Sequence, residues 1–194
     1  MVAESASSSE PLLTLEPLLE AVREGLEGSG WGLSGLQKTT SYEFEGRWAG
    51  SSSRSAFLFF HKEGVPDWVS IDVFLDETSG GLKGNLALVV EGPELARVGD
   101  PEAVLGGLSG VGSSRLPKGY RVPLTLKYRL SNLGADPREA ETEYRFRVQI
   151  PREALAGGRA PVAELASMAA RAFEGILTSR DMIPYLEGVD PGPS

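Results

Sequence analysis

Three titratable side chains in the first half of the chain could support catalysis: His61, Asp72 and Asp76. A histidine beside a carboxylate can act as a general base, and a serine from the run 51–55 would complete a Ser-His-Asp arrangement. Asp72 and Asp76 fall on one face of a predicted strand, where with Glu77 they could bind Mg²⁺ or transfer a proton. Such a site would belong to a small hydrolase or a nucleotide-dependent enzyme.

The positions of these residues favour a non-catalytic role. His61 stands at the end of a predicted strand, where a lone histidine is more often a surface or packing residue. Carboxylates at strand ends and turns are commonplace, and no lysine follows Asp72 and Asp76 at the spacing of a nuclease site. We therefore expect no catalytic site, and the enzyme remains the alternative hypothesis.

Cationic residues alternate along two predicted strands within 121–150, which places them on one sheet face. They are Lys127, Arg129, Arg145 and Arg147. This face could bind an acidic protein surface or phosphate, which makes a nucleic-acid-associated factor the second alternative. The Tyr and Phe side chains of the same strands point to the opposite face, so they cannot stack on bases. Because Glu141 and Glu143 neutralise part of the patch, we expect a solvated, ion-paired face.

Two glycine-rich stretches lack the spacing of nucleotide-binding loops. The glycines at 28, 30, 32 and 35 follow a predicted helix and precede a strand, whereas a dinucleotide fingerprint needs the reverse order. The Gly-Ser run 106–114 lacks both the Gly-Lys-Ser/Thr ending of a P-loop and Gly-x-Ser-x-Gly spacing around Ser109. We expect a linker after the helix, a flexible connector at 106–114, and no cofactor.

The composition excludes several classes of site. The 194 residues include no cysteine and one histidine, which excludes disulfides, thiolate zinc sites and multi-histidine metal sites. The net charge of −8 repels phosphate backbones at long range, so nucleic acid is an unexpected partner. Few amides and no cysteine are typical of thermophiles, although GC-rich coding would also favour arginine over lysine.

Two amphipathic helices are predicted, one near each end of the chain. Thr14 is a suitable N-cap for a helix ending near Glu27, whose apolar residues recur at helical spacing. These residues are Leu15, Leu18, Leu19, Val22 and Leu26. Pro161 opens the second helix, with a similar stripe from Val162 to Leu177.

Alternating apolar and polar residues, and at 56–60 a stretch that is apolar on both faces, predict about six strands between these helices. Their ranges are 39–48, 56–60, 68–75, 85–90, 122–130 and 143–150. In the last pair, one register places Arg129 opposite Glu141 and Lys127 opposite Glu143. A shift by two residues would instead place Lys127 opposite Arg145, so we favour the first register.

These elements predict an α+β fold with a single antiparallel sheet. A meander of four strands and a C-terminal pair would form the sheet, and both helices would pack on one face. We expect a single domain at 11–186 with an irregular or helical insert at 91–119. The tails at 1–10 and 187–194 should be disordered.

This order of elements is similar to that of the small helix–sheet–helix domains of type III secretion chaperones. The resemblance implies a chaperone-like or adaptor role. Several apolar residues occur on both strand faces, so we expect a non-enzymatic protein-binding module that self-associates through a sheet face or edge. No apolar run approaches the roughly 20 residues of a membrane span and no secretory signal is evident, so we expect a cytoplasmic protein.

Overall fold

The structure is a computed structural model. It describes residues 10–41, 53–91, 106, 109–111, 114, 124–130, 132, 134–136, 141–180 and 182–183. Residues 1–9 and 184–194, which include most of the predicted tails, lie outside this set, as does the predicted strand segment 42–48. No helix among the described residues is long and apolar enough to cross a bilayer.

One antiparallel sheet organises the chain, and its strand order is β1-β2-β3-β4-β6-β5. The strands are β1 (Gly32–Ser41), β2 (Ser53–His61), β3 (Val69–Thr78), β4 (Gly81–Glu91), β5 (Leu124–Arg129) and β6 (Glu141–Gln149). The first four strands pair in sequence, and β6 then pairs with β4 and leaves β5 at the edge. The prediction of an α+β fold with a single antiparallel sheet is confirmed.

The predicted register of the last hairpin is confirmed. Lys127 lies opposite Glu143 and Arg129 opposite Glu141. Lys127 Nζ donates to Glu143 Oε1 at 3.0 Å, and Arg129 Nη1 approaches Glu141 Oε2 at 3.4 Å. The charge pattern was informative because a slip by two residues would have placed two cations opposite one another.

The start of the first strand was predicted wrongly. β1 begins at Gly32 rather than Thr39, so Gly32 and Gly35 belong to a strand and not to a linker. Trp31, directly before the strand, is fully buried in the core. Gly35 follows a β-bulge, and a Cβ there would lie 3.3 Å from the ring of Phe59. A bulge and two glycines hide the period-two pattern on which the prediction depended.

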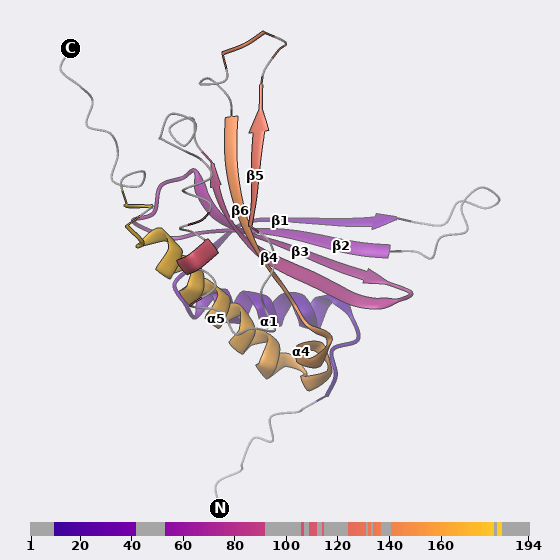
Figure 1. Ribbon diagram of the computed structural model, residues 1–194. Coiled ribbons are helices and arrows are strands. Elements are labelled where there is room, and N and C mark those ends of the chain that lie inside the picture. The colour runs from indigo at the N-terminus through magenta and orange to yellow at the C-terminus, as the bar shows by residue number, and fades with distance from the viewer. Residues whose placement is uncertain are drawn as a thin grey trace, which may run out of the picture.

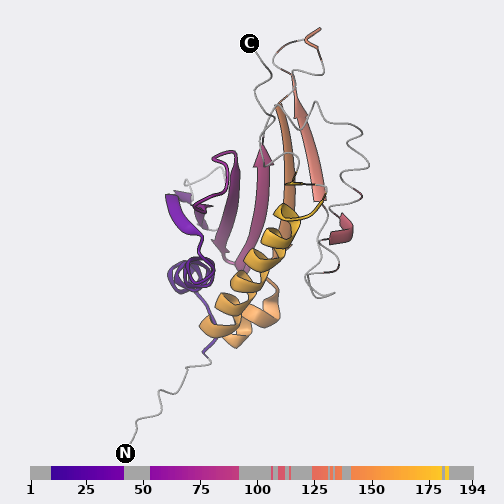
Figure 2. The same ribbon diagram turned by 90° about the vertical axis from the view of Figure 1, so that its left-hand side faces the viewer.

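The helices are α1 (Leu15–Glu27), the short α4 (Arg152–Gly157) and α5 (Arg159–Leu177). Figures 1 and 2 show α1 and α5 side by side across one face of the sheet. They approach closely at Gly25, where a Cβ would lie 2.2 Å from the carbonyl oxygen of Ala163. α5 begins at Arg159, before the predicted Pro161, because Gly158 takes the positive φ that separates it from α4.

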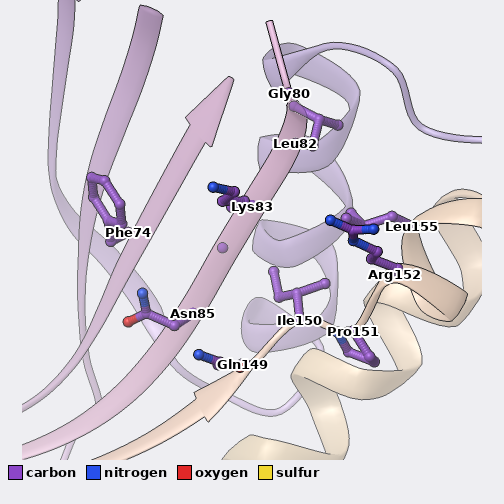
Figure 3. Close-up of a pocket in the computed structure, with 11 residues that line it drawn as sticks. Phe74, Gly80, Leu82, Lys83, Asn85, Gln149, Ile150, Pro151, Arg152 and Leu155 are labelled. Atoms are coloured by element: carbon purple, nitrogen blue, oxygen red, sulfur yellow. The ribbon is translucent and has the colours of Figure 1, made fainter. Parts of the chain in front are cut away.

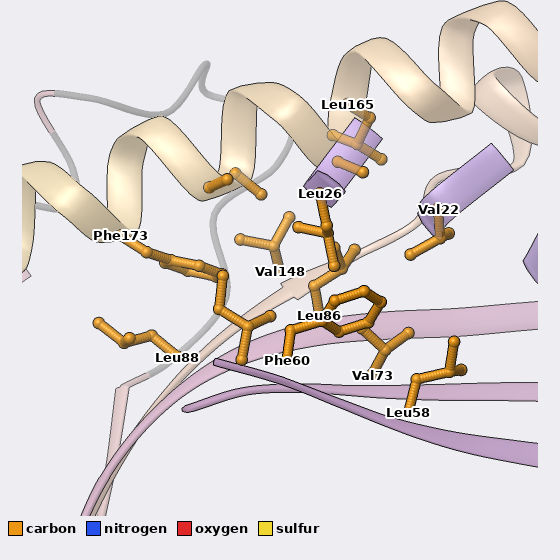
Figure 4. Packing of buried hydrophobic residues seen from close by; sticks show 14 of the residues in the cluster. Val22, Leu26, Leu58, Phe60, Val73, Leu86, Leu88, Val148, Leu165 and Phe173 are labelled. Carbon is orange, nitrogen blue, oxygen red and sulfur yellow. The ribbon is translucent and has the colours of Figure 1, made fainter. Parts of the chain in front are cut away.

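A single core fills the space between helices and sheet (Figure 4). Leu58, Phe60, Val73, Leu86, Leu88 and Val148 come from the strands, and Val22, Leu26, Leu165 and Phe173 come from the helices. Phe146 and Phe173 meet edge to face, with ring centroids 6.1 Å apart. The strand side chains in this core all lie on the face of the sheet that α1 and α5 cover.

The Gly-Ser run differs from its prediction at the residues that are described. Gly106, Ser109, Gly110, Val111 and Ser114 are helical, which agrees with a helical insert at 91–119 but not with the flexible connector expected at 106–114. Val111 packs partly buried against the core. Contact of Val111 with the core stabilises this segment. The glycine content of the run, which disfavours a helix, did not indicate that contact.

Candidate interaction surface on the open sheet face

The sheet face opposite α1 and α5, here called the open face, carries the side chains that could bind a partner. Every second side chain of each strand points to the open face. All four predicted binding cations are among them: Lys127, Arg129, Arg145 and Arg147. The open face also carries two of the predicted catalytic residues, Asp72 and Asp76. It is therefore the surface on which the sequence predictions can be compared with geometry.

Three phenylalanines form an aromatic strip on the open face: Phe57, Phe59 and Phe74. Phe57 lies directly opposite Phe74, and their ring centroids are 4.9 Å apart. Phe57 is 36% exposed and Phe59 is 37% exposed, so both rings offer apolar surface to solvent. A contiguous exposed apolar patch on a soluble domain often marks an interaction site.

An ion-pair ladder, Lys127–Glu143–Arg145–Asp72, crosses the open face from β5 to β3. Glu143 Oε1 accepts from Lys127 Nζ at 3.0 Å and from Arg145 Nε at 2.9 Å. Arg145 Nη2 then reaches over β4 to Asp72 Oδ2 at 3.1 Å. The side chains of β4 beneath this crossing, Ala87 and Val89, are 1% and 2% exposed.

The ladder alters the acidity of its central carboxylate. Burial would raise the pKa of Glu143, but the hydrogen bond from Lys127 and the charge of Arg145 oppose that effect. Together they outweigh burial and hold the pKa of Glu143 below its ordinary value. Glu143 is therefore ionised at neutral pH and balances the cations on either side of it.

Most of the predicted cationic patch is consequently engaged within the protein. Lys127 and Arg145 are held in the ladder, and Arg129 pairs with Glu141 in an exposed contact that contributes little stability. Arg147 lies opposite Ala87 and makes no hydrogen bond or ion pair with the part of the chain that is described. A nucleic-acid role for these residues stays a prediction, supported by the Arg147 guanidinium, which no described residue engages.

The structure does not bring the three predicted catalytic residues into contact. Asp72 accepts from Ser70 Oγ at 2.8 Å and from Arg145, while Asp76 accepts from Ser55 Oγ at 2.8 Å. On β2, His61 is two residues from Phe59, which lies opposite Asp72, and six residues from Ser55, which lies opposite Asp76. These separations are roughly 7 Å and roughly 20 Å along an extended strand.

No hydrogen bond or ion pair among the described residues joins these groups into a catalytic arrangement. Within the described ranges, no hydrogen bond connects His61 to either aspartate, and no three acidic or histidine residues cluster as metal ligands. Ser51 and Ser52 fall outside the described residues. The catalytic role of His61, Asp72 and Asp76 thus stays a prediction.

The β1 edge is a feature that the sequence prediction missed. β1 is the outermost strand beside the aromatic strip, and no described strand pairs with its outer side. Leu36 in this strand is 46% exposed, and Lys38 is the only charged residue between Gly32 and Ser41. An exposed strand edge with little charge is a template for pairing with another strand. Correct placement of the strand at 32–41 would have revealed it.

Comparison of the chain with known families, proteins and structures identified no relative. No protein-family model matches the chain, and neither a curated protein nor a solved structure is significantly similar to it. The resemblance to type III secretion chaperones therefore depends on the order of elements alone.

Proposed function

We propose that this protein is a non-enzymatic protein-binding module of the adaptor or chaperone-like kind, and that it self-associates. The contact would be made by the β1 edge together with the adjoining aromatic strip. The observation that carries this proposal is a nearly uncharged strand directly beside two exposed phenylalanines, with no described strand on its outer side. Edge pairing supplies backbone hydrogen bonds, and the exposed rings supply apolar area.

The charge distribution selects the β1 edge as the contact between two copies of the chain. Each copy carries a net charge of −8, so two copies repel one another over most orientations. The β1 edge contains no carboxylate and a single cation, Lys38, so approach along this edge meets the least repulsion. The opposite edge, β5, carries Lys127 and Arg129 on alternate residues, a pattern that discourages edge pairing.

A two-fold symmetric contact fits an antiparallel edge. Two β1 strands that pair antiparallel present the same residues to each other, as an isologous dimer requires. The two sheets would then become continuous, and the two aromatic strips would lie on the same side of the joint. Burial of Leu36 against its counterpart would remove exposed apolar surface from water.

The test introduces a carboxylate at the proposed contact. Leu36→Glu should convert the dimer to a monomer, because each copy would then bury an unpaired negative charge beside its own counterpart. Thr125→Glu is the matched control, since Thr125 is an exposed residue on the opposite edge strand. Equal masses for Leu36→Glu and the native protein by light scattering would contradict the proposal.

A further inference from the structure

A cavity of about 380 Å³ lies where β4 begins, β6 ends and α4 follows (Figure 3). β6 pairs with β4 only from Asn85 to Glu91, and Pro151 then takes the chain away from the sheet. The first residues of β4 therefore have no described strand beside them on this side. The volume falls within the range of small-molecule sites, which is about 300–1,000 Å³.

The cavity has an apolar wall and a polar rim. Leu82, Ile150 and Leu155 are buried side chains that form the wall, and Phe74 of the aromatic strip lies at its border. The rim contains two cations and two amides. These are Lys83, Asn85, Gln149 and Arg152.

The two amides are placed by the register of the sheet. Asn85 lies directly opposite Gln149 in the β4–β6 ladder, so both side chains leave the same face of the sheet at the rim of the cavity. Each amide can donate two hydrogen bonds and accept others. Neither side chain is hydrogen-bonded to any residue that the structure describes, so these donors are available to a ligand.

The two cations also have no partner in the described part of the chain. Lys83 and Arg152 make no hydrogen bond or ion pair with any described residue, whereas other cations of the fold, such as Lys62 and Arg145, are ion-paired. Asp76 faces Lys83 in the β3–β4 register, but its carboxylate accepts from Ser55 at 2.8 Å. Two positive charges thus border one cavity in a chain whose net charge is −8.

We propose that this cavity binds a small amphipathic anion, in which a carboxylate or phosphate headgroup is attached to an apolar body. Lys83 and Arg152 would hold the headgroup, and Asn85 and Gln149 would donate hydrogen bonds to it. The apolar body would lie along Ile150 and Leu155. Arginine in particular suits this headgroup, since its planar guanidinium can donate two parallel hydrogen bonds to a carboxylate or phosphate. The site is separate from the β1 edge and does not depend on self-association.

Titration calorimetry of the full-length protein with octanoate and with octyl phosphate tests the proposal, and octylammonium serves as the cationic control. At least one anion should bind saturably, and octylammonium should bind at least tenfold more weakly. The double variant Lys83→Gln/Arg152→Gln should weaken anion binding by tenfold or more, because it removes both charge-assisted contacts. Lys127→Gln, which removes a cation elsewhere on the open face, should leave the affinity unchanged.

Three results would overturn the proposal: neither anion binds, octylammonium binds as tightly as the anions, or the double variant binds like the native protein. Binding of one anion alone would support it and would identify the headgroup as a carboxylate or a phosphate. Both substituted side chains are exposed, so the double variant should fold, and an unchanged thermal unfolding curve checks this. The mass of the protein, measured separately, keeps this test independent of the proposed dimer.

Discussion

The carboxylate of Glu77 accepts a hydrogen bond from the backbone N–H of Leu15 at 2.6 Å, and this bond joins the end of β3 to the start of α1. Thr14 occupies the N-cap position, as predicted, but its side chain makes no capping hydrogen bond. Glu77, on a distant strand, therefore provides the hydrogen-bond acceptor that a helix cap residue normally provides from the adjoining chain. It also accepts from Arg54, which in turn contacts Glu16 of α1.

Glu77→Ala should destabilise the protein by about 1–2 kcal/mol, the usual loss when a helix cap is removed. The change leaves the first N–H of α1 without its acceptor and takes away one partner of Arg54. Glu16→Ala is the comparison, because it removes an exposed contact to the same guanidinium and leaves the hydrogen bond from Leu15 to Glu77 in place. Urea unfolding of both variants gives the comparison, and an equal loss for the two would contradict a capping role for Glu77.

The ion-pair ladder should make stability depend on pH in the acidic range. The pKa of folded Glu143 lies below its unfolded value, so the folded state favours the ionised form. Its contribution to the free energy of unfolding is thus complete above the unfolded pKa of about 4.5 and is lost as the pH falls through the lower, folded pKa. Glu143→Gln should be less stable than the native protein by a constant amount above about pH 6, with a difference that shrinks towards pH 3.

Unfolding measured across this pH range in both proteins tests the ladder. Glu141→Gln is the control, since Glu141 lies in the same strand with an exposed partner and has no comparable network. A difference between native and Glu143→Gln proteins that did not change with pH would contradict the ladder as its source.

The contact between the two long helices predicts a strict size limit at Gly25. A methyl group there would approach the Ala163 carbonyl oxygen at 2.2 Å, so α1 and α5 would have to move apart. Gly25→Ala should cost about 1–3 kcal/mol from overpacking, in spite of the higher helix propensity of alanine. Gly106→Ala is the control because nothing lies within 4 Å of its added methyl group. A thermal unfolding midpoint for Gly25→Ala equal to that of the native protein would contradict the close approach.

The sequence was most informative where charge and alternation act together. The β5–β6 hairpin has both, and its register followed from the two opposite-charge pairs, Lys127 with Glu143 and Arg129 with Glu141. β1 has neither feature: it contains a single charged residue, and glycines and a bulge interrupt its alternation between Leu33 and Gly35. That one error concealed the β1 edge, on which the proposed function depends.

Contacts across non-adjacent strands could not be predicted from pattern. Arg145 meets Asp72 because β6 inserts beside β4, which brings it within reach of β3. Alternation assigns both residues to a face but does not set the order of strands. The capping of α1 by Glu77 is hidden for the same reason, since the two residues are separated by 62 positions.

The solution mass of the native protein, measured by light scattering over a series of concentrations, tests the central claim most directly. Self-association through the β1 edge predicts a mass of twice the 20.7 kDa chain at high concentration, falling to that of the single chain on dilution. A mass of 20.7 kDa at every concentration would contradict the proposed self-association.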